Sequence, residues 1–199
     1  MSRLNRPLHH APWLLLAGVL ACGGGGSAVP APAPAPVHSD ERPRFVPIAD
    51  AGTVAIVRMA NNVDLAYAII ASTRASRPEV KALVKREKAA HTELNRSLLR
   101  LASRLDITPR EDDVSRLLRD QSLPRRDSLR ALSGRRFDSA YVANEIRQHR
   151  ELLVAIDSVF LPSVSHPALA SYLSTTLRPA VSAHLTQAER LQTTLARPK

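Results

Sequence analysis

Apolar side chains recur three and four positions apart along four long stretches of this chain, and this spacing constrains the fold more than any other feature. Three or four residues make about one helical turn, so each stretch presents one apolar face as a helix. The stretches cover residues 49–76, 78–105, 138–161 and 167–196. Glycine is sparse after residue 26 and aromatic residues are only 4% of the chain. We therefore predict an all-α fold.

The connection between the second and third long helices is the longest in this part of the chain. Residues 108–111 are typical of a capping box with Pro109 at the first helical position, which predicts one short helix there. Residues 122–133 predict a second short helix, ended by Gly134. Four long helices with a longer middle connection predict an antiparallel four-helix bundle.

A proline interrupts the last long helix. Pro179 stands five residues before His184 and removes one backbone donor, so the carbonyl of Thr175 loses its helical partner. We expect a kink here. The bend could wrap the helix around the core, or the free carbonyl could face a ligand.

Each long helix also carries one polar residue within its apolar stripe. Two carboxylates lie four positions before the histidines of the second and third helices, on the same faces. Counted at about 1.5 Å per residue from the nearest predicted turn, the candidates lie near mid-bundle, with the last histidine about one turn deeper. The candidates are Asp64, Glu87, His91, Glu145, His149 and His184.

These residues support three hypotheses, namely a metal site, a hydrogen-bonded core, and a site for some other small ligand. Two or three histidines with one or two carboxylates suit Fe, Mn or Zn as a bound metal. Alternatively, the histidines are buried core residues that fix helix register through hydrogen bonds to Asn61, Asn95, Asp64 or Tyr141. The Glu-x-x-His spacing of di-iron bundles is absent, because the Glu–His spacing here is four.

The N-terminal region predicts export and lipidation. Arg3 and Arg6 precede a short apolar run that ends in Val-Leu-Ala-Cys, which has the layout of a secretory signal and resembles the bacterial lipobox. We predict a signal peptide over residues 1–21, acylation of Cys22 as a membrane anchor, a Gly- and Ala-Pro-rich tether over 22–46, and a domain over 47–199. The alternative is a cleaved signal with an incidental cysteine.

Four segments together resemble the domain of unknown function 4142 family of bacterial envelope proteins. They are residues 61–65, residues 80–91, residues 137–142 leading to His149, and residues 177–181 leading to His184. The resemblance covers about residues 48–195 and implies a ferritin-like four-helix fold with no established activity. This chain has Ala90 where an aspartate is common and Asp64 where a glutamate is usual.

The chain is basic, with a formal net charge of +10. A basic surface near a membrane could meet anionic lipid or cell-wall polymers. Nucleic acid is not an expected partner, because export separates the chain from it and few aromatic residues are available for stacking. Eight arginines are candidates for such a surface: Arg110, Arg116, Arg119, Arg125, Arg126, Arg130, Arg135 and Arg136.

No nucleophile motif or Gly-rich phosphate loop occurs, so an enzyme is not the favoured class. We predict a lipid-anchored structural or interaction module of the cell envelope, with another envelope protein as one expected partner. Because Gly23 follows the cysteine, we expect an outer-membrane lipoprotein that faces the periplasm, with the inner membrane or cell surface as alternatives. The other function classes are a metal-binding or metal-dependent redox protein, and an envelope stress factor that binds anionic polymers through the arginine segment.

Overall fold

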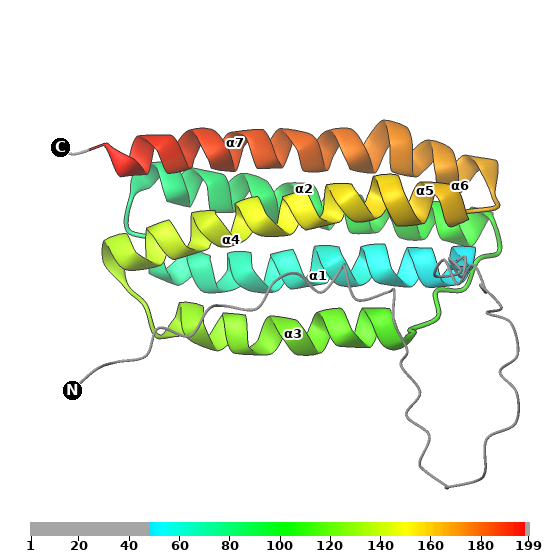
Figure 1. The fold of residues 1–199 in the computed structure, drawn as a ribbon, viewed down its shortest axis with the longest axis horizontal. Coiled ribbons are helices and arrows are strands. Elements are labelled where there is room, and N and C mark those ends of the chain that lie inside the picture. The colour runs from blue at the N-terminus through cyan, green and yellow to red at the C-terminus, as the bar shows by residue number, and fades with distance from the viewer. Residues whose placement is uncertain (1–47, 198–199) are drawn as a thin grey trace, which may run out of the picture. The chain divides into compact units, whose positions relative to one another are not determined.

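The computed structural model describes residues 48–197, and every regular element in this part of the chain is a helix. The four long helices of the predicted bundle are present as α1 (Asp50–Arg74), α2 (Pro78–Arg104), α4 (Gly134–Ala155) and α7 (Arg178–Ala196). They lie side by side with alternating direction (Figure 1). The all-α bundle prediction is confirmed, whereas the predictions for the signal peptide, Cys22 and the tether fall outside the described residues.

The bundle is built from two helix pairs. α1 packs on α2, α4 packs on α7, and contacts of α1 with α4 and of α2 with α7 join the pairs. One apolar layer lies near the α1–α2 turn and includes Tyr67, Leu83, Phe137 and Tyr141. A second fills the other end and includes Ile56, Leu98, Ile156, Phe160, Leu169 and Leu173. The predicted polar candidates lie between these layers along the helices.

α1 is the most apolar of the described helices. It alone among them is long and apolar enough to cross a membrane by length and composition. However, 67% of its apolar window is buried inside the bundle, and Asn61 and Asp64 interrupt that window. α1 therefore serves as the central core helix, with α2 and α3 packed against it.

The middle connection differs from the prediction of two short helices. It forms one continuous helix, α3 (Asp113–Arg130), which packs along α1 (Figure 1). The capping box is made by Asp112 and Ser115, not by residues 108–111: the Ser115 N–H donates to Asp112 Oδ1 at 2.8 Å, and the Asp112 N–H donates to Ser115 Oγ at 2.9 Å. Pro124 is exposed within α3, and packing against α1 offsets the single backbone bond that it removes.

The third long helix starts earlier and ends later than predicted. It begins at Gly134, whose φ of 55° suits glycine, instead of near Asp138. It also does not stop before Pro162, because a π-helical turn, η2 (Ile156–Phe160), leads into α5 (Leu161–Ser163). In this turn the Leu161 N–H donates to the carbonyl five residues back, which accommodates the proline that follows.

The fourth long helix changes its hydrogen-bonding pattern ahead of Pro179, where the sequence predicts a kink. The change takes the form of a second π turn, η3 (Leu173–Leu177), between α6 (Pro167–Tyr172) and α7. Four buried residues follow one another at steps of four through this region: Leu169 of α6, Leu173 and Leu177 of η3, and Val181 of α7. In a regular α-helix each step of four residues moves the side chain about 40° around the helix axis, or about 120° over the three steps. A π turn has more residues per turn, so it reduces this drift and keeps the four side chains on one face.

Candidate metal centre

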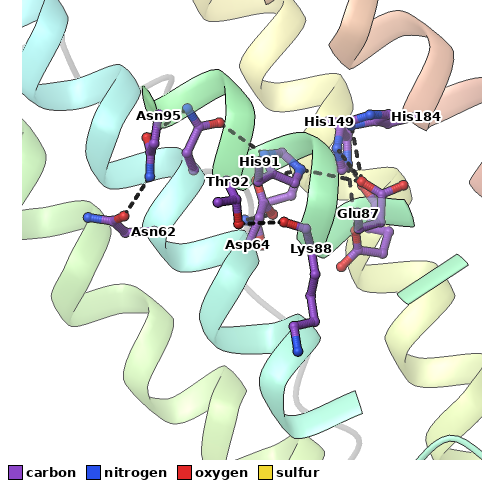
Figure 2. Close-up of polar contacts among 12 residues, drawn as sticks. Asn62, Asp64, Glu87, Lys88, His91, Thr92, Asn95, His149 and His184 are labelled. Carbon is purple, nitrogen blue, oxygen red and sulfur yellow. Dashed lines mark hydrogen bonds and ion pairs between the residues drawn. The ribbon is translucent and has the colours of Figure 1, made fainter. Parts of the chain in front are cut away.

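Four side chains from three helices converge in the polar layer. Glu87 and His91 come from α2, His149 from α4 and His184 from α7. One ligand atom of each lies within 4.8 Å of the corresponding atom of every other. Figure 2 shows Glu87 beside His149 and His184, with His91 next to them on the same helix as Glu87. Three helices of the bundle therefore meet at one polar point.

The geometry is close to a triangle of imidazoles around one carboxylate oxygen. The ring centroids are 5.6 Å apart for His91 and His149, 5.1 Å for His91 and His184, and 5.3 Å for His149 and His184. Glu87 Oε2 lies 3.3 Å from His91 Nε2, 3.9 Å from His149 Nε2 and 3.0 Å from His184 Nδ1. All four side chains are buried, and His184, at 8% exposed, is the nearest to solvent.

A chain of amides sets the proton position on His91. Asn61 Nδ2 donates to Asn95 Oδ1 at 3.0 Å, so the Asn61 oxygen faces His91 and accepts from its Nδ1–H at 3.0 Å. Asn95 Nδ2 in turn donates to Asn62 Oδ1 at 2.8 Å (Figure 2). The Nε2 atom of His91 is therefore the unprotonated nitrogen, and it points toward Glu87.

His149 is oriented in a similar way by its own helix. Its Nδ1–H donates to the backbone carbonyl of Glu145 at 2.8 Å, which leaves Nε2 unprotonated and facing Glu87. Metal-ligating histidines generally donate their other ring N–H to such a partner. Within the described residues, the four converging atoms are buried without a hydrogen-bond partner: Glu87 Oε2, His91 Nε2, His149 Nε2 and His184 Nδ1.

Burial keeps the histidines neutral. Removal from solvent lowers the pKa of His91 to about 4. Burial, reinforced by the neighbouring His91, lowers the pKa of His149 to about 4, and burial also lowers the pKa of His184. At neutral pH the three rings are therefore in the form that binds metals.

Asp64 and Glu145 border the cluster. Asp64 Oδ2 lies 3.7 Å from His91 Nε2, and its other oxygen accepts from Gln148 Nε2 at 2.6 Å. Glu145 Oε2 lies 4.0 Å from His149 Nδ1, and the Tyr141 hydroxyl, one turn earlier on α4, is close enough to act on the Glu145 carboxyl group as a hydrogen-bond donor. Burial first, and then the charge of nearby carboxylates, raises the pKa of both groups. Both therefore favour the protonated form in the absence of a cation.

The position of His184 corrects one expectation. It was predicted to lie about one turn deeper than the other histidines, level with Glu145, yet its ring lies within 5.3 Å of both rings. The prediction placed the end of the third helix before Pro162, whereas the helix continues to Ser163. The two extra residues and the two π turns change the relative levels of α4 and α7.

Gln148 was missed as a partner of Asp64. Gln148 donates to the Asp64 carboxylate from the position directly before His149 on α4. That neighbouring position was the only sequence signal for this contact, and a single glutamine forms no spacing pattern.

The hydrogen-bonded core hypothesis accounts for part of the cluster only. The predicted bond between His91 and Asn61 is present. Within residues 48–197, no hydrogen bond joins a histidine of the cluster to Asn95 or Tyr141, and the second nitrogen of each oriented ring has no partner. A buried polar atom without a partner costs about 1–3 kcal/mol. Hydrogen bonding among core residues thus leaves His91 Nε2 and His149 Nε2 unexplained, whereas His184 Nδ1 and Glu87 Oε2, 3.0 Å apart, are within reach of each other.

The eight candidate arginines lie apart from this cluster. Five are on α3, Arg135 and Arg136 are in the first turn of α4, and Arg110 is in the connection before α3. Several are paired with acids: Arg116 with Asp113, Arg119 with Glu111 and Asp120, and Arg130 with Asp127. The segment is therefore basic but partly neutralised by its own carboxylates.

A protein-family model described as Domain of unknown function (DUF4142) matches residues 34–191. No curated protein and no solved structure matches the chain. The match spans α1 to most of α7 and includes all four converging residues.

Proposed function

The chain belongs to the DUF4142 family, in agreement with the resemblance seen in its sequence, and we propose that it binds one divalent transition-metal ion inside the helical bundle. The observation that carries this proposal is the convergence of four buried ligand atoms without hydrogen-bond partners: Glu87 Oε2, His91 Nε2, His149 Nε2 and His184 Nδ1.

The donor set fits such an ion. Three neutral imidazoles and one carboxylate suit Zn, Fe or Mn. Four ligands bound tetrahedrally at about 2.0–2.1 Å lie about 3.4 Å from one another, so the widest pair, now at up to 4.8 Å, has to close by about 1.4 Å when an ion binds. The Asn61 amide and the Glu145 carbonyl already orient two of the rings, which is the outer-shell support that metal histidines use.

The closed character of the site favours holding an ion over catalysis on it. Structural zinc sites use four protein ligands, whereas catalytic ones keep a position open for water or substrate. Here four ligands are present and all are buried. A bound ion would connect α2, α4 and α7, and we propose that it stabilises an envelope module whose outer faces make the interactions. The second candidate function is metal-dependent redox chemistry. It would require the ion to change oxidation state, so it applies only if the site takes Fe or Mn.

The test is the metal content of residues 47–199, purified without a tag, stripped by a chelator and reloaded separately with Zn²⁺, Mn²⁺ and Fe²⁺. We expect about one ion per chain. His91→Ala and His149→Ala should each lose it, because each removes a ligand.

His166→Ala is the matched control. His166 is the only histidine of the described residues outside the cluster, where it caps α6. The control should retain the metal. A wild-type chain that takes up no ion, or equal loss in the control, would contradict the proposal.

We also propose that the domain is anchored through acylated Cys22, at the periplasmic side of the outer membrane. The lipobox-like sequence before Cys22 supports this proposal. Cys22→Ser should move the protein from the membrane fraction to the soluble fraction. Retention of the variant in the membrane fraction would mean that another feature holds the protein there.

A further inference from the structure

A groove of ≈ 680 Å³ lies on the outer surface where α2 meets the C-terminal half of α1. Its apolar lining includes Ala71, Val84 and Ala89. None of the four converging residues lines it, so the groove is separate from the candidate metal centre. Its volume is in the range of small-ligand pockets.

One side of the groove is cationic. Lys81, Lys85 and Lys88 line it at spacings of four and three, which places them on one side of α2, and all three are exposed. The whole sequence has only one other lysine, Lys199. No ion pair joins these three ammonium groups to a carboxylate within residues 48–197, whereas Arg96 in the same groove is paired with Glu93. The groove therefore carries positive charge that its neighbours do not neutralise.

The arginine segment differs from the lysine side of the groove, because three of its eight arginines are engaged by acids. Arg116, Arg119 and Arg130 each pair with an acidic side chain nearby in the sequence. An anion that binds them has to compete with those carboxylates. The three lysines have no such competitor.

The chemistry of the groove points to an amphiphile. Lysine ammonium groups are separate point charges on flexible stems, which suit a diffuse anionic surface better than a single bidentate ligand. The apolar stems can cover the apolar lining while the charged ends reach outward. Ile69, which is 61% exposed, lies one turn before Ser72 of the groove on α1 and adds apolar surface.

We propose that the lysine groove, formed by Lys81, Lys85 and Lys88 of α2 and the facing residues of α1, binds the phosphate-bearing headgroups of anionic lipids and so docks this face on a membrane surface. The proposal is independent of the metal centre and of the predicted lipid anchor.

The test uses residues 47–199, which contain the whole helical bundle and its core but not Cys22. Flotation with vesicles of phosphatidylcholine, with and without phosphatidylglycerol, measures the partition coefficient. We expect binding to the anionic vesicles only, weakened by added salt. Each lysine near an anionic surface contributes about a fivefold gain in partitioning, so the triple variant Lys81→Gln, Lys85→Gln, Lys88→Gln should bind about a hundredfold less.

The matched control removes the same charge elsewhere, in Arg116→Gln, Arg119→Gln, Arg130→Gln. It should keep most of the binding, and the lysine variant should keep the wild-type melting temperature and metal content. Equal loss in both triple variants would show attraction to net charge and overturn the proposal. Absence of wild-type binding, or full displacement by free glycerol 3-phosphate, would overturn it as well, the latter in favour of a soluble phosphate ester.

Discussion

Single residues around His91 determine which of its nitrogens is available to a metal. Asn61 holds the Nδ1 proton, and Asn95 and Asn62 hold Asn61 in turn. Asn61→Leu removes the acceptor without adding charge, so the ring loses its fixed orientation. We expect metal affinity to fall by about 10–100-fold, as for other outer-shell changes.

The measurement is competition for the metal against a chelator of known affinity. Asn62→Leu, at the exposed end of the same chain of amides, is the control and should bind nearly as well as wild type. Equal affinities for Asn61→Leu and wild type would mean that the amide chain does not position the ring.

The lowered histidine pKa values predict a pH dependence of stability in the metal-free protein. The pKa of His149 is about 4 in the folded state against 6.5 as the ordinary value. Above pH 6.5 the ring is neutral in both states. As the pH falls from 6.5 to 4, the unfolded chain takes up a proton that the folded chain does not, so the free energy of unfolding falls.

His149→Gln should remove this proton. Its free energy of unfolding should decline less steeply than that of wild type, by up to about 1.4 kcal/mol per pH unit in this window. The raised pKa values of Asp64 and Glu145 act in the opposite direction, because the folded state keeps protons that the unfolded chain loses as the pH rises. Wild type and His149→Gln both contain these two carboxyl groups, so their effect cancels in the comparison. Urea unfolding at several pH values measures the difference, and parallel curves would contradict it.

The candidate residues were largely predictable at this scale, but their roles were not. Apolar stripes with a regular period place His91, His149 and His184 inside, since burial follows from spacing alone. The different positions of Glu87 and Glu145 relative to the histidine rings could not be predicted, because each glutamate stands four residues before a histidine on the apolar stripe of its helix. Only the packing of three helices decides that Glu87 faces all the rings while Glu145 lies to one side.

At the scale of elements, one buried carboxylate closes the α1–α2 turn. Asp138 of α4 accepts from the backbone N–H groups of Ser76 at 2.9 Å and Arg77 at 3.0 Å, and from the Ser76 hydroxyl. Asp138→Ala leaves these donors without the acceptor. We expect the free energy of unfolding to fall by about 2–4 kcal/mol, measured by urea denaturation. Asp157→Ala, which breaks an exposed pair with Arg178, should change it little; a similar loss in both would contradict this role.

The element boundaries show where local sequence signals fail. Prolines at 162 and 179 predict helix ends or kinks, and each is instead accommodated after a π turn within a continuing helical segment. Pro124 is tolerated inside α3 because tertiary packing on α1 compensates for one lost bond. Such outcomes depend on the neighbouring helix, so they could not be derived from the local sequence.

At the scale of the whole molecule, the proposed ion would connect three helices that are far apart in the sequence. Binding to the folded state only, at a free ion concentration 100 times Kd, adds about 2.7 kcal/mol of stability. For a domain of this size we expect the melting temperature to rise by about 5–10 °C on metal addition. The rise should be absent in His149→Ala and present in His166→Ala. A melting temperature that ignores the metal would contradict a stabilising role.

The most direct measurement of the central claim is an anomalous difference map from crystals of metal-loaded residues 47–199, recorded at the absorption edge of the ion. The account predicts one strong peak about 2.0–2.2 Å from His91 Nε2, His149 Nε2, His184 Nδ1 and a Glu87 carboxylate oxygen. No peak in the bundle, or a peak only at His166 or another surface side chain, would show that the four residues form a polar core without a metal.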